Sequence, residues 1–337
     1  MTAEILSTHT PALFAAAVKR AVKLLRAGEV VALPTETVYG LAANALDAKA
    51  VEKIFKIKGR PANNPIIVHI DGVEMAKRCV TKWPTTADKL AKAFWPGPLT
   101  LVLPRATVIS DIVTAGGPTV GVRWPSHPFI QAVIRECGFP LAVPSANLSG
   151  CVSPTNARHV RKQLGGKIDL IVDGGQSQVG IESTVLDLMV SPPQILRPGM
   201  IHAESLAAVV GKVHSLKSKV QSPKSALRGP GLLKKHYAPK AKLLVLNWRN
   251  DADLRKQIEN RQFEIGNCCV IAHTRVPAAA NFACVSVIPH DAGAFAQAIY
   301  AEFHRCDEMG VKLVVIEAPP AAPEWSGITD RLRRAAA

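Results

Sequence analysis

Short apolar runs alternate with amphipathic helix patterns, and this alternation constrains the fold more than any other feature of the chain. The first helix pattern begins at Pro11, after a Thr10 that can cap the helix, and ends before Gly28. The apolar run Glu29–Leu33 follows it, and the next helix pattern covers Ala48–Lys58. Strands and helices intermixed in this way predict an α/β domain.

The alternation continues along the rest of the chain. Up to residue 211 we expect further strands and helices at Pro65–Ile70, Thr86–Phe94, Leu99–Leu103, Gly121–Trp124, Pro128–Cys137, Leu141–Val143, Leu170–Val172, Thr184–Leu188, Gln194–Leu196 and Ala203–Val210. From residue 241 on, we expect them at Leu243–Leu246, Ala252–Asn260, Cys268–Ala272, Val285–Ile288, Ala292–Met309, Leu313–Ile316 and Ile328–Ala335. The second set predicts a small doubly wound, Rossmann-like domain, although it contains neither G-x-G-x-x-G nor a P-loop.

A basic segment separates the two sets. The chain has a formal net charge of +15, and no acidic residue stands between Glu204 and Asp251. The cations of this stretch are Lys212, Lys217, Lys219, Lys224, Arg228, Lys234, Lys235, Lys240, Lys242 and Arg249. Such a block is typical of a solvated linker, and it also attracts polyanions. The sequence therefore predicts a domain at 1–211, a basic linker at 212–240 and a second domain at 241–337.

The cysteines and the apolar runs exclude other classes of protein. The chain has seven cysteines, none of them in a C-x-x-C pair or at zinc-ligand spacing, so we expect reduced thiols without a redox or zinc function. No apolar run approaches the roughly 18–20 residues that span a bilayer. We expect a soluble, cytoplasmic protein.

Three loops of the first domain are rich in glycine, proline, hydroxyl and amide residues, and one of them also carries two cations, Lys58 and Arg60. They are Pro34–Leu41, Lys58–Pro65 and Pro144–Gly150, the last extended by Ser153–Thr155. Taken singly, each has a structural explanation as a turn or a helix cap. Taken together, they indicate a cleft in which hydroxyl, amide and backbone N–H groups bind an anion. Because local motifs give no evident nucleophile, the site suits chemistry driven by binding and charge neutralisation, such as transfer at phosphorus.

Longer motifs then identify a family. They are PTETVYGL (34–41), IFKIKGRPANNPIIVHI (54–70), WPGPLTLVL (95–103), VGVRWPSH (120–127), PSANLSG (144–150), ESTVLDL (182–188), LRPG (196–199) and GPGLLKKHYAPK (229–240). In this order they resemble the YrdC-like family, in the long two-domain form of the threonylcarbamoyl-AMP synthases. The resemblance covers nearly the whole chain. It implies a twisted mixed sheet with flanking helices, followed by the small Rossmann-like domain.

The resemblance also implies a reaction. L-Threonine and bicarbonate or CO2 give an N-carboxylated threonine, which attacks the α-phosphorus of ATP, with Mg2+ accompanying the nucleotide. The products are L-threonylcarbamoyladenylate and pyrophosphate. A downstream threonylcarbamoyl transferase complex then modifies tRNA, which this chain contacts, if at all, without needing it for the reaction. We expect no membrane partner.

The family's K-x-R and S-x-N motifs match Lys58, Arg60, Ser145 and Asn147, which are the expected catalytic residues. By the same resemblance these four bind ATP together with Asn64, Thr119, Ser153, Arg197 and His236. The expected L-threonine site contains Thr37, His69, Arg123, Val143 and Ser183. The segment around His236 is expected to cover the site as a lid, and no protein ligand of a metal is assigned.

An RNA-binding module in tRNA or ribosome maturation is the alternative, supported by the net charge of +15. It predicts RNA affinity that falls steeply with salt and no release of pyrophosphate. The concentration of charge in the linker and the aromatic content of 5% argue against it, because few rings are present for bases to stack on.

Overall fold

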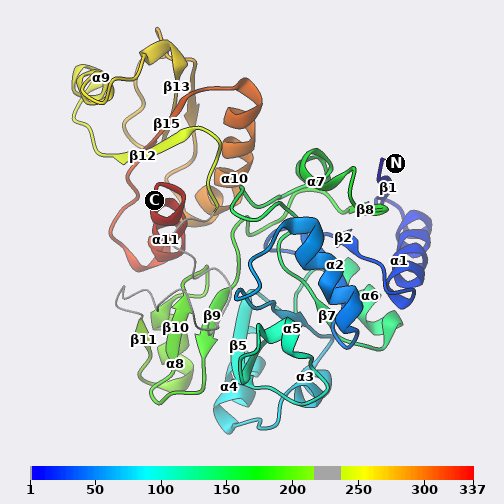
Figure 1. Cartoon of the computed structure of the whole chain (residues 1–337). Coiled ribbons are helices and arrows are strands. Elements are labelled where there is room, and N and C mark those ends of the chain that lie inside the picture. Colours follow the sequence, from blue (N-terminus) through cyan, green and yellow to red (C-terminus); the bar gives the residue numbers. More distant parts are fainter. Residues whose placement is uncertain (1, 216–236) are drawn as a thin grey trace. The chain divides into compact units, whose positions relative to one another are not determined.

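The computed structural model describes residues 2–215 and 237–337, which form two compact units (Figure 1). Unit 1 comprises the described residues of Met1–Ser149 and Ser153–Leu233. Unit 2 comprises those of Gly150–Val152 and Lys234–Ala337. Both units are α/β, and the predicted fold class is confirmed.

Unit 1 is built on one large mixed sheet with the strand order β1-β8-β2-β3-β7-β4-β6-β5-β9-β10-β11. Its strands are β1 (Glu4–Ser7), β2 (Val31–Leu33), β3 (Gly40–Asn44), β4 (Val68–His69), β5 (Leu99–Pro104), β6 (Thr119–Arg123), β7 (Leu141–Ala142), β8 (Leu170–Asp173), β9 (Thr184–Asp187), β10 (Gln194–Arg197) and β11 (His214–Ser215). β4 runs parallel to β6, and His69 stands in register with Arg123. Because neighbouring strands place paired side chains on one face, this register brings two predicted site residues together.

The first two helices of unit 1 begin and end where local chemistry predicts. Thr10 Oγ1 accepts the N–H of Leu13 and caps the first helix, and Asp47 caps the second. Gly59 ends that second helix with φ of 60°, a left-handed conformation that glycine adopts without strain. The helices are α1 (Pro11–Arg26), α2 (Ala48–Lys58), α3 (Val73–Cys79), α4 (Thr85–Phe94), α5 (Asp111–Thr114), α6 (Pro128–Cys137), α7 (Ala157–Leu164) and α8 (Ala203–Val210).

Unit 2 has a four-stranded sheet in the order β12-β15-β13-β14, and every strand pair in it is parallel. Its elements are β12 (Lys242–Leu246), α9 (Asp251–Glu259), β13 (Cys268–Ala272), β14 (Cys284–Val287), α10 (Ala292–Met309), β15 (Leu313–Glu317) and α11 (Ser326–Ala335), with short 3-10 turns at Ile265–Asn267 and Pro323–Trp325. Cys268 and Val270 pack with Leu254 of α9 on one face of the sheet. α10 lies on the other side of the sheet from α9 (Figure 1). The predicted second α/β sheet is therefore present.

Several elements have no counterpart among the predictions. β1 and the helices α3, α5 and α7 were not expected, and β3 begins inside the segment expected to be a loop. β11 lies within the segment predicted to be a linker and pairs in parallel with β10. These short or weakly patterned elements depend on a neighbour for their stability: β1, for example, pairs along its whole length with β8.

The rest of that linker up to His236 lies outside the described residues, and so does the expected lid. In the part of the chain that the structure describes, no helix is both long and apolar enough to cross a membrane.

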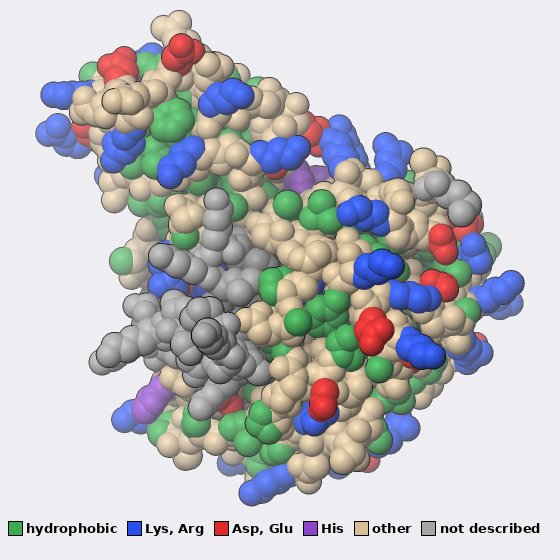
Figure 2. Space-filling model, viewed as in Figure 1, with side chains coloured by type: hydrophobic (Ala, Val, Ile, Leu, Met, Phe, Trp, Pro, Cys, Tyr) green, Lys and Arg blue, Asp and Glu red, His purple; other side chains and the backbone are tan. Residues whose placement is uncertain are grey.

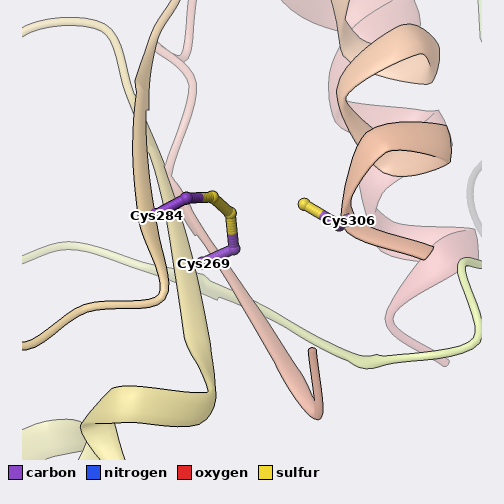
Figure 3. A group of neighbouring side chains, drawn as sticks. All are labelled: Cys269, Cys284 and Cys306. Atoms are coloured by element: carbon purple, nitrogen blue, oxygen red, sulfur yellow. A yellow bond between two sulfur atoms is a disulfide. The ribbon is translucent and has the colours of Figure 1, made fainter. Parts of the chain in front are cut away.

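The expectation that all cysteines are reduced is wrong for one pair. Cys269 of β13 and Cys284 of β14 form a disulfide (Figure 3). The two residues stand directly opposite each other in the parallel register, with Cα atoms 4.6 Å apart, a separation that disulfides commonly bridge. Cys306 of α10 points toward them, but burial raises the pKa of its thiol to about 12, so it stays protonated. Sequence spacing could not reveal a pair that only strand register creates.

The disulfide predicts the number of reactive thiols. The chain denatured without reductant should show five free thiols, and the reduced chain should show all seven. Cys284→Ser should lower the free energy of unfolding by about 3 kcal/mol, because the bond closes a loop of 15 residues. Ellman titration and urea unfolding measure the two effects. Cys137→Ser, which removes a free thiol, is the control for the thiol count, and seven thiols without reductant would refute the pairing.

Candidate active site

The loop between β2 and β3 is a compact turn made by its own hydroxyl groups. Thr35 Oγ1 lies 2.9 Å from Thr37 Oγ1 and donates to the carbonyl of Val38 at 2.6 Å. Thr35, Glu36 and Thr37 are all buried. Such side-chain to backbone bonds fix a turn without regular secondary structure. The turn therefore presents the side chains of residues 36 and 37 in defined directions.

A second segment is bound to this turn through the backbone. The N–H groups of Val179 and Gly180 donate to the carbonyls of Glu36 and Thr37 at 2.7 and 3.0 Å. Ser177 Oγ donates to the carbonyl of Thr35 at 3.0 Å. These bonds place the segment that leads to Ser183 beside the turn, although the two are far apart in the sequence.

Gly40, at the end of the turn, permits a close approach of two chain segments. A Cβ atom on Gly40 would lie 2.2 Å from Val143 Cγ1, well inside van der Waals contact. The backbone of Gly40 forms a bridge with Ser145. The glycine of PTETVYGL is therefore needed for the contact between the first and third predicted loops.

Lys58, Ser145 and Asn147, three of the four expected catalytic residues, lie together. The ammonium group of the buried Lys58 donates to the carbonyls of Ser145 and Asn147 and lies 3.3 Å from Asn147 Oδ1. Ser145 Oγ donates to the same Oδ1 atom. The carbonyl of Lys58 in turn accepts the N–H of Ser149 at 2.9 Å. A buried cation thus shapes the Pro144–Gly150 loop around itself.

Arg60 and Asn64 form the other side of the second loop. Arg60 Nε donates to the carbonyl of Asn64 at 2.9 Å, and Arg60 Nη2 to that of Pro65 at 2.6 Å. Asn64 is buried, and its Oδ1 atom has no hydrogen-bond partner among the described residues. A buried, unpaired amide oxygen costs free energy, which is typical of a site shaped for a ligand.

Arg123, at the end of β6, is buried among polar groups. Its Nη1 atom donates to Thr37 Oγ1 at 3.0 Å, its Nε atom to the carbonyl of Gly97 at 3.3 Å, and its Nη2 atom lies 2.6 Å from Glu36 Oε1. On the neighbouring strand, burial and then the Arg123 charge hold the pKa of His69 well below 6.5. Neither ring nitrogen of His69 has a hydrogen-bond partner among the described residues. His69 is therefore a neutral imidazole beside a buried guanidinium group.

Ser183 connects the two groups of residues that the sequence assigned to different substrates. Its hydroxyl lies 2.8 Å from Thr100 Oγ1 and 3.1 Å from Arg197 Nη2. Arg197 Nε also donates to the carbonyl of Ser183 at 3.0 Å. Ser153 is buried and donates to Glu182 Oε1 at 2.6 Å, next to Ser183 in the chain. The expected nucleotide residues Ser153 and Arg197 thus adjoin the expected threonine residue Ser183.

The remaining predicted residues differ in how they are placed. Val143 is buried, and its N–H donates to the carbonyl of Ile67. Thr119 lies at the start of β6, the end opposite Arg123, and no hydrogen bond or ion pair joins its side chain to another predicted site residue in the described part of the chain. His236 lies outside the described residues.

The sequence reasoning missed three buried polar residues in contact with the site, namely Glu36, Thr100 and Glu182. Each contacts a predicted residue: Glu36 pairs with Arg123, Thr100 with Ser183 and Glu182 with Ser153. All three stand inside motifs that the sequence singled out, so the signal was present. The sequence did not show which residue each of the three contacts.

These features define the class of protein. Loops and strand ends of a mixed α/β sheet carry buried cations, amides and hydroxyls, which is chemistry that suits an anionic ligand. A family model of the Sua5/YciO/YrdC type, described as "Telomere recombination", matches residues 23–199. A second model, "Threonylcarbamoyl-AMP synthase, C-terminal domain", matches residues 201–337. The chain belongs to the Sua5/YciO/YrdC family and carries the C-terminal domain of its threonylcarbamoyl-AMP synthases.

Individual relatives agree with the family models. The threonylcarbamoyl-AMP synthase of Pyrococcus abyssi is 45% identical over 242 residues, covering 72% of this chain and 71% of the relative. That of Schizosaccharomyces pombe is 36% identical over 361 residues, covering 95% and 88%. The crystal structure of P. abyssi Sua5 complexed with L-threonine superposes with a TM-score of 0.89 at 35% identity, over 100% of this chain and 98% of that one.

The buried His69 predicts how stability depends on pH. Its folded pKa is below 6.5, so below pH 6.5 the unfolded chain binds the proton first and stability falls as the pH falls. Between pH 6.5 and pH 5 this loss is at most about 2 kcal/mol, at about 1.4 kcal/mol per pH unit. His69→Gln should reduce the difference between urea unfolding at pH 7.5 and pH 5. The exposed His9→Gln is the control, and an unchanged difference in His69→Gln would contradict a neutral His69.

Proposed function

We propose that the chain is a threonylcarbamoyl-AMP synthase, which converts L-threonine, bicarbonate or CO2 and ATP to L-threonylcarbamoyladenylate and pyrophosphate. The observation that carries this is the likeness along its full length to a Sua5 structure that contains L-threonine. The N-terminal unit adds a site whose polar groups suit a nucleotide and an amino acid. The RNA-binding alternative has no comparable support: on the face shown in Figure 2, Lys and Arg side chains of unit 1 are scattered among Asp and Glu.

The reaction needs charge stabilisation more than a protein nucleophile. The threonine nitrogen, once carboxylated, carries a carbamate whose oxygen attacks the α-phosphorus of ATP. A carbamate oxygen to phosphorus bond forms, the bond to the bridging α–β oxygen breaks, and pyrophosphate leaves with that electron pair. Cations and N–H donors aimed at the phosphorus oxygens lower the barrier of such a step.

We assign the nucleotide to the residues around Lys58. In this proposal Lys58, Arg60, Ser145 and Asn147 stabilise the charge that develops at the α-phosphorus. Lys58 does so partly by holding the loop that carries Ser145 and Asn147, because its ammonium group already donates to that loop. Asn64, Thr119, Ser153 and Arg197 complete the proposed nucleotide contacts, with His236 added from the sequence motif.

We assign L-threonine to the residues around Arg123. The guanidinium group suits the substrate carboxylate, because it has N–H groups left after its bonds to Thr37 and Gly97. Thr37, His69 and Ser183 offer hydroxyl and imidazole groups to the substrate's hydroxyl and amine, and Val143 contributes an apolar wall. Arg197 touches Ser183, so the threonine carbamate forms beside the nucleotide contacts.

The remaining parts of the proposal concern partners. Mg2+ accompanies ATP, and phosphate oxygens and water supply most of its ligands. The product passes to a threonylcarbamoyl transferase complex that modifies tRNA, and we place both steps in the cytoplasm. Contact of this chain with tRNA is not required by the chemistry.

Arg60→Ala tests the catalytic assignment. We expect threonine-dependent release of pyrophosphate to fall by about 100-fold or more, the scale seen when one donor to a developing oxyanion is removed. Arg105→Ala is the matched control, because Arg105 also donates to the carbonyl four residues ahead, at Ile109, and is not among the residues assigned to either substrate. Full activity in Arg60→Ala, or an equal loss in Arg105→Ala, would remove Arg60 from the mechanism. Pyrophosphate release that does not depend on threonine would reject the function itself.

Amino-acid selectivity tests the threonine site. Valine has the shape of threonine without its hydroxyl and would leave a buried polar partner unpaired, so we expect kcat/KM for valine to be lower by about 10⁴-fold or more. For serine, which lacks only a methyl group, we expect kcat/KM to be about 10- to 200-fold lower than for threonine. Pyrophosphate release with each amino acid measures both ratios. Valine accepted as well as serine would contradict a buried hydroxyl partner.

A further inference from the structure

Glu36 is a buried acid at the site, and the proposed reaction gives it no role. Its side chain is 3% exposed, and its Oε1 atom lies 2.6 Å from Arg123 Nη2. Neither carboxylate oxygen has a hydrogen-bond partner among the described residues. We propose that Glu36 is a positioning residue, which holds the Arg123 guanidinium in the orientation that binds the threonine carboxylate. This inference rests on the proposed function.

The contacts of Arg123 show how the orientation is fixed. A guanidinium group has five N–H donors in one plane. The carbonyl of Gly97 takes one through Nε, and Thr37 Oγ1 takes one through Nη1. Glu36 attracts the Nη2 side, although Nη2 makes no hydrogen bond among the described residues. The plane is thus held on three sides, while N–H groups of Nη1 and Nη2 remain for a bidentate carboxylate.

A charged partner is needed here because Arg123 is itself buried, with a side chain 4% exposed. A buried guanidinium without a counter-charge is strongly unfavourable, and its side chain would turn toward water or toward any other acceptor. The neighbouring His69 is neutral and adds no compensation. The charge of Glu36 also acts at His127, where it opposes the lowering of that pKa by burial. Glu36 therefore supplies the negative charge that keeps Arg123 inside the site before the substrate arrives.

The same contact could instead make Glu36 compete with the threonine carboxylate for Arg123. If Glu36 merely occupied Arg123, the carboxylate of threonine would have to displace it, and removal of the Glu36 charge would tighten threonine binding. Positioning and competition therefore predict changes of opposite sign in the KM for threonine. The substitution should leave the turn intact, because Val179 N–H binds the backbone carbonyl of Glu36 and not its side chain.

The test is Glu36→Gln, assayed by pyrophosphate release with threonine and ATP varied separately. We expect the KM for threonine to rise by about tenfold or more, as for the loss of a charge-assisted contact. The KM for ATP should change by less than about twofold. General damage to the fold would not produce this selective effect on threonine. Glu29→Gln is the matched control, because Glu29 pairs with Lys53 at 2.8 Å on the surface. An unchanged or lower KM for threonine in Glu36→Gln would overturn the proposal.

A double-mutant cycle with Arg123→Lys identifies the route of the effect. If Glu36 acts through Arg123, the double variant binds threonine no more weakly than Arg123→Lys alone, whereas additive losses would overturn the proposal. Should Glu36→Gln fail to fold, Glu36→Asp is the second variant. It keeps the negative charge but moves it one methylene further from Arg123. A KM for threonine equal to that of the unaltered chain would then count against positioning. Absence of threonine-dependent activity in the unaltered chain would refute the proposed function instead, so the two failures are distinguishable.

Discussion

The burial of two cations, Lys58 and Arg123, is the constraint on which the arrangement of the site depends. A charge removed from water must be compensated by acceptors or by an opposite charge. Lys58 is compensated by the carbonyls of the Pro144–Gly150 loop, and Arg123 by Glu36, Thr37 and Gly97. The Pro144–Gly150 loop is arranged around Lys58, whereas the turn at Thr35–Val38 is fixed by its own hydroxyls and offers Glu36 and Thr37 to Arg123.

This constraint explains why loops rather than strands supply the acceptors for the two cations. Strand carbonyls are committed to the sheet, so only a turn or loop has carbonyls to spare for a side-chain ammonium or guanidinium group. The turn at Thr35–Val38 and the loop at Pro144–Gly150 meet through the bridge of Gly40 and Ser145. The loops that surround Lys58 and Arg123 are therefore linked through the backbone.

In unit 2, the disulfide depends on which strands are adjacent in the sheet. The strands of this unit were evident from their apolar runs, and in the structure two of its helices begin at side-chain caps, Asn250 and Asp291. The disulfide between Cys269 and Cys284 was not evident, because it requires β13 and β14 to be adjacent and in that register. A shift of one residue would have directed the two thiols to opposite faces of the sheet.

The sequence by itself determined the α/β class, most element boundaries and the family, because apolar periodicity, caps and long ordered motifs are local properties of the chain. It also named Lys58, Arg60, Ser145 and Asn147 as a group; the structure joins Lys58 to Ser145 and Asn147, while Arg60 donates to the carbonyls of Asn64 and Pro65. Only the tertiary structure decided that Glu36 is the counter-charge of Arg123, that Ser183 adjoins Arg197, and that Thr119 lies at the opposite end of its strand from Arg123. These facts are relations between residues distant in sequence. They follow from strand order and register, which no local pattern encodes.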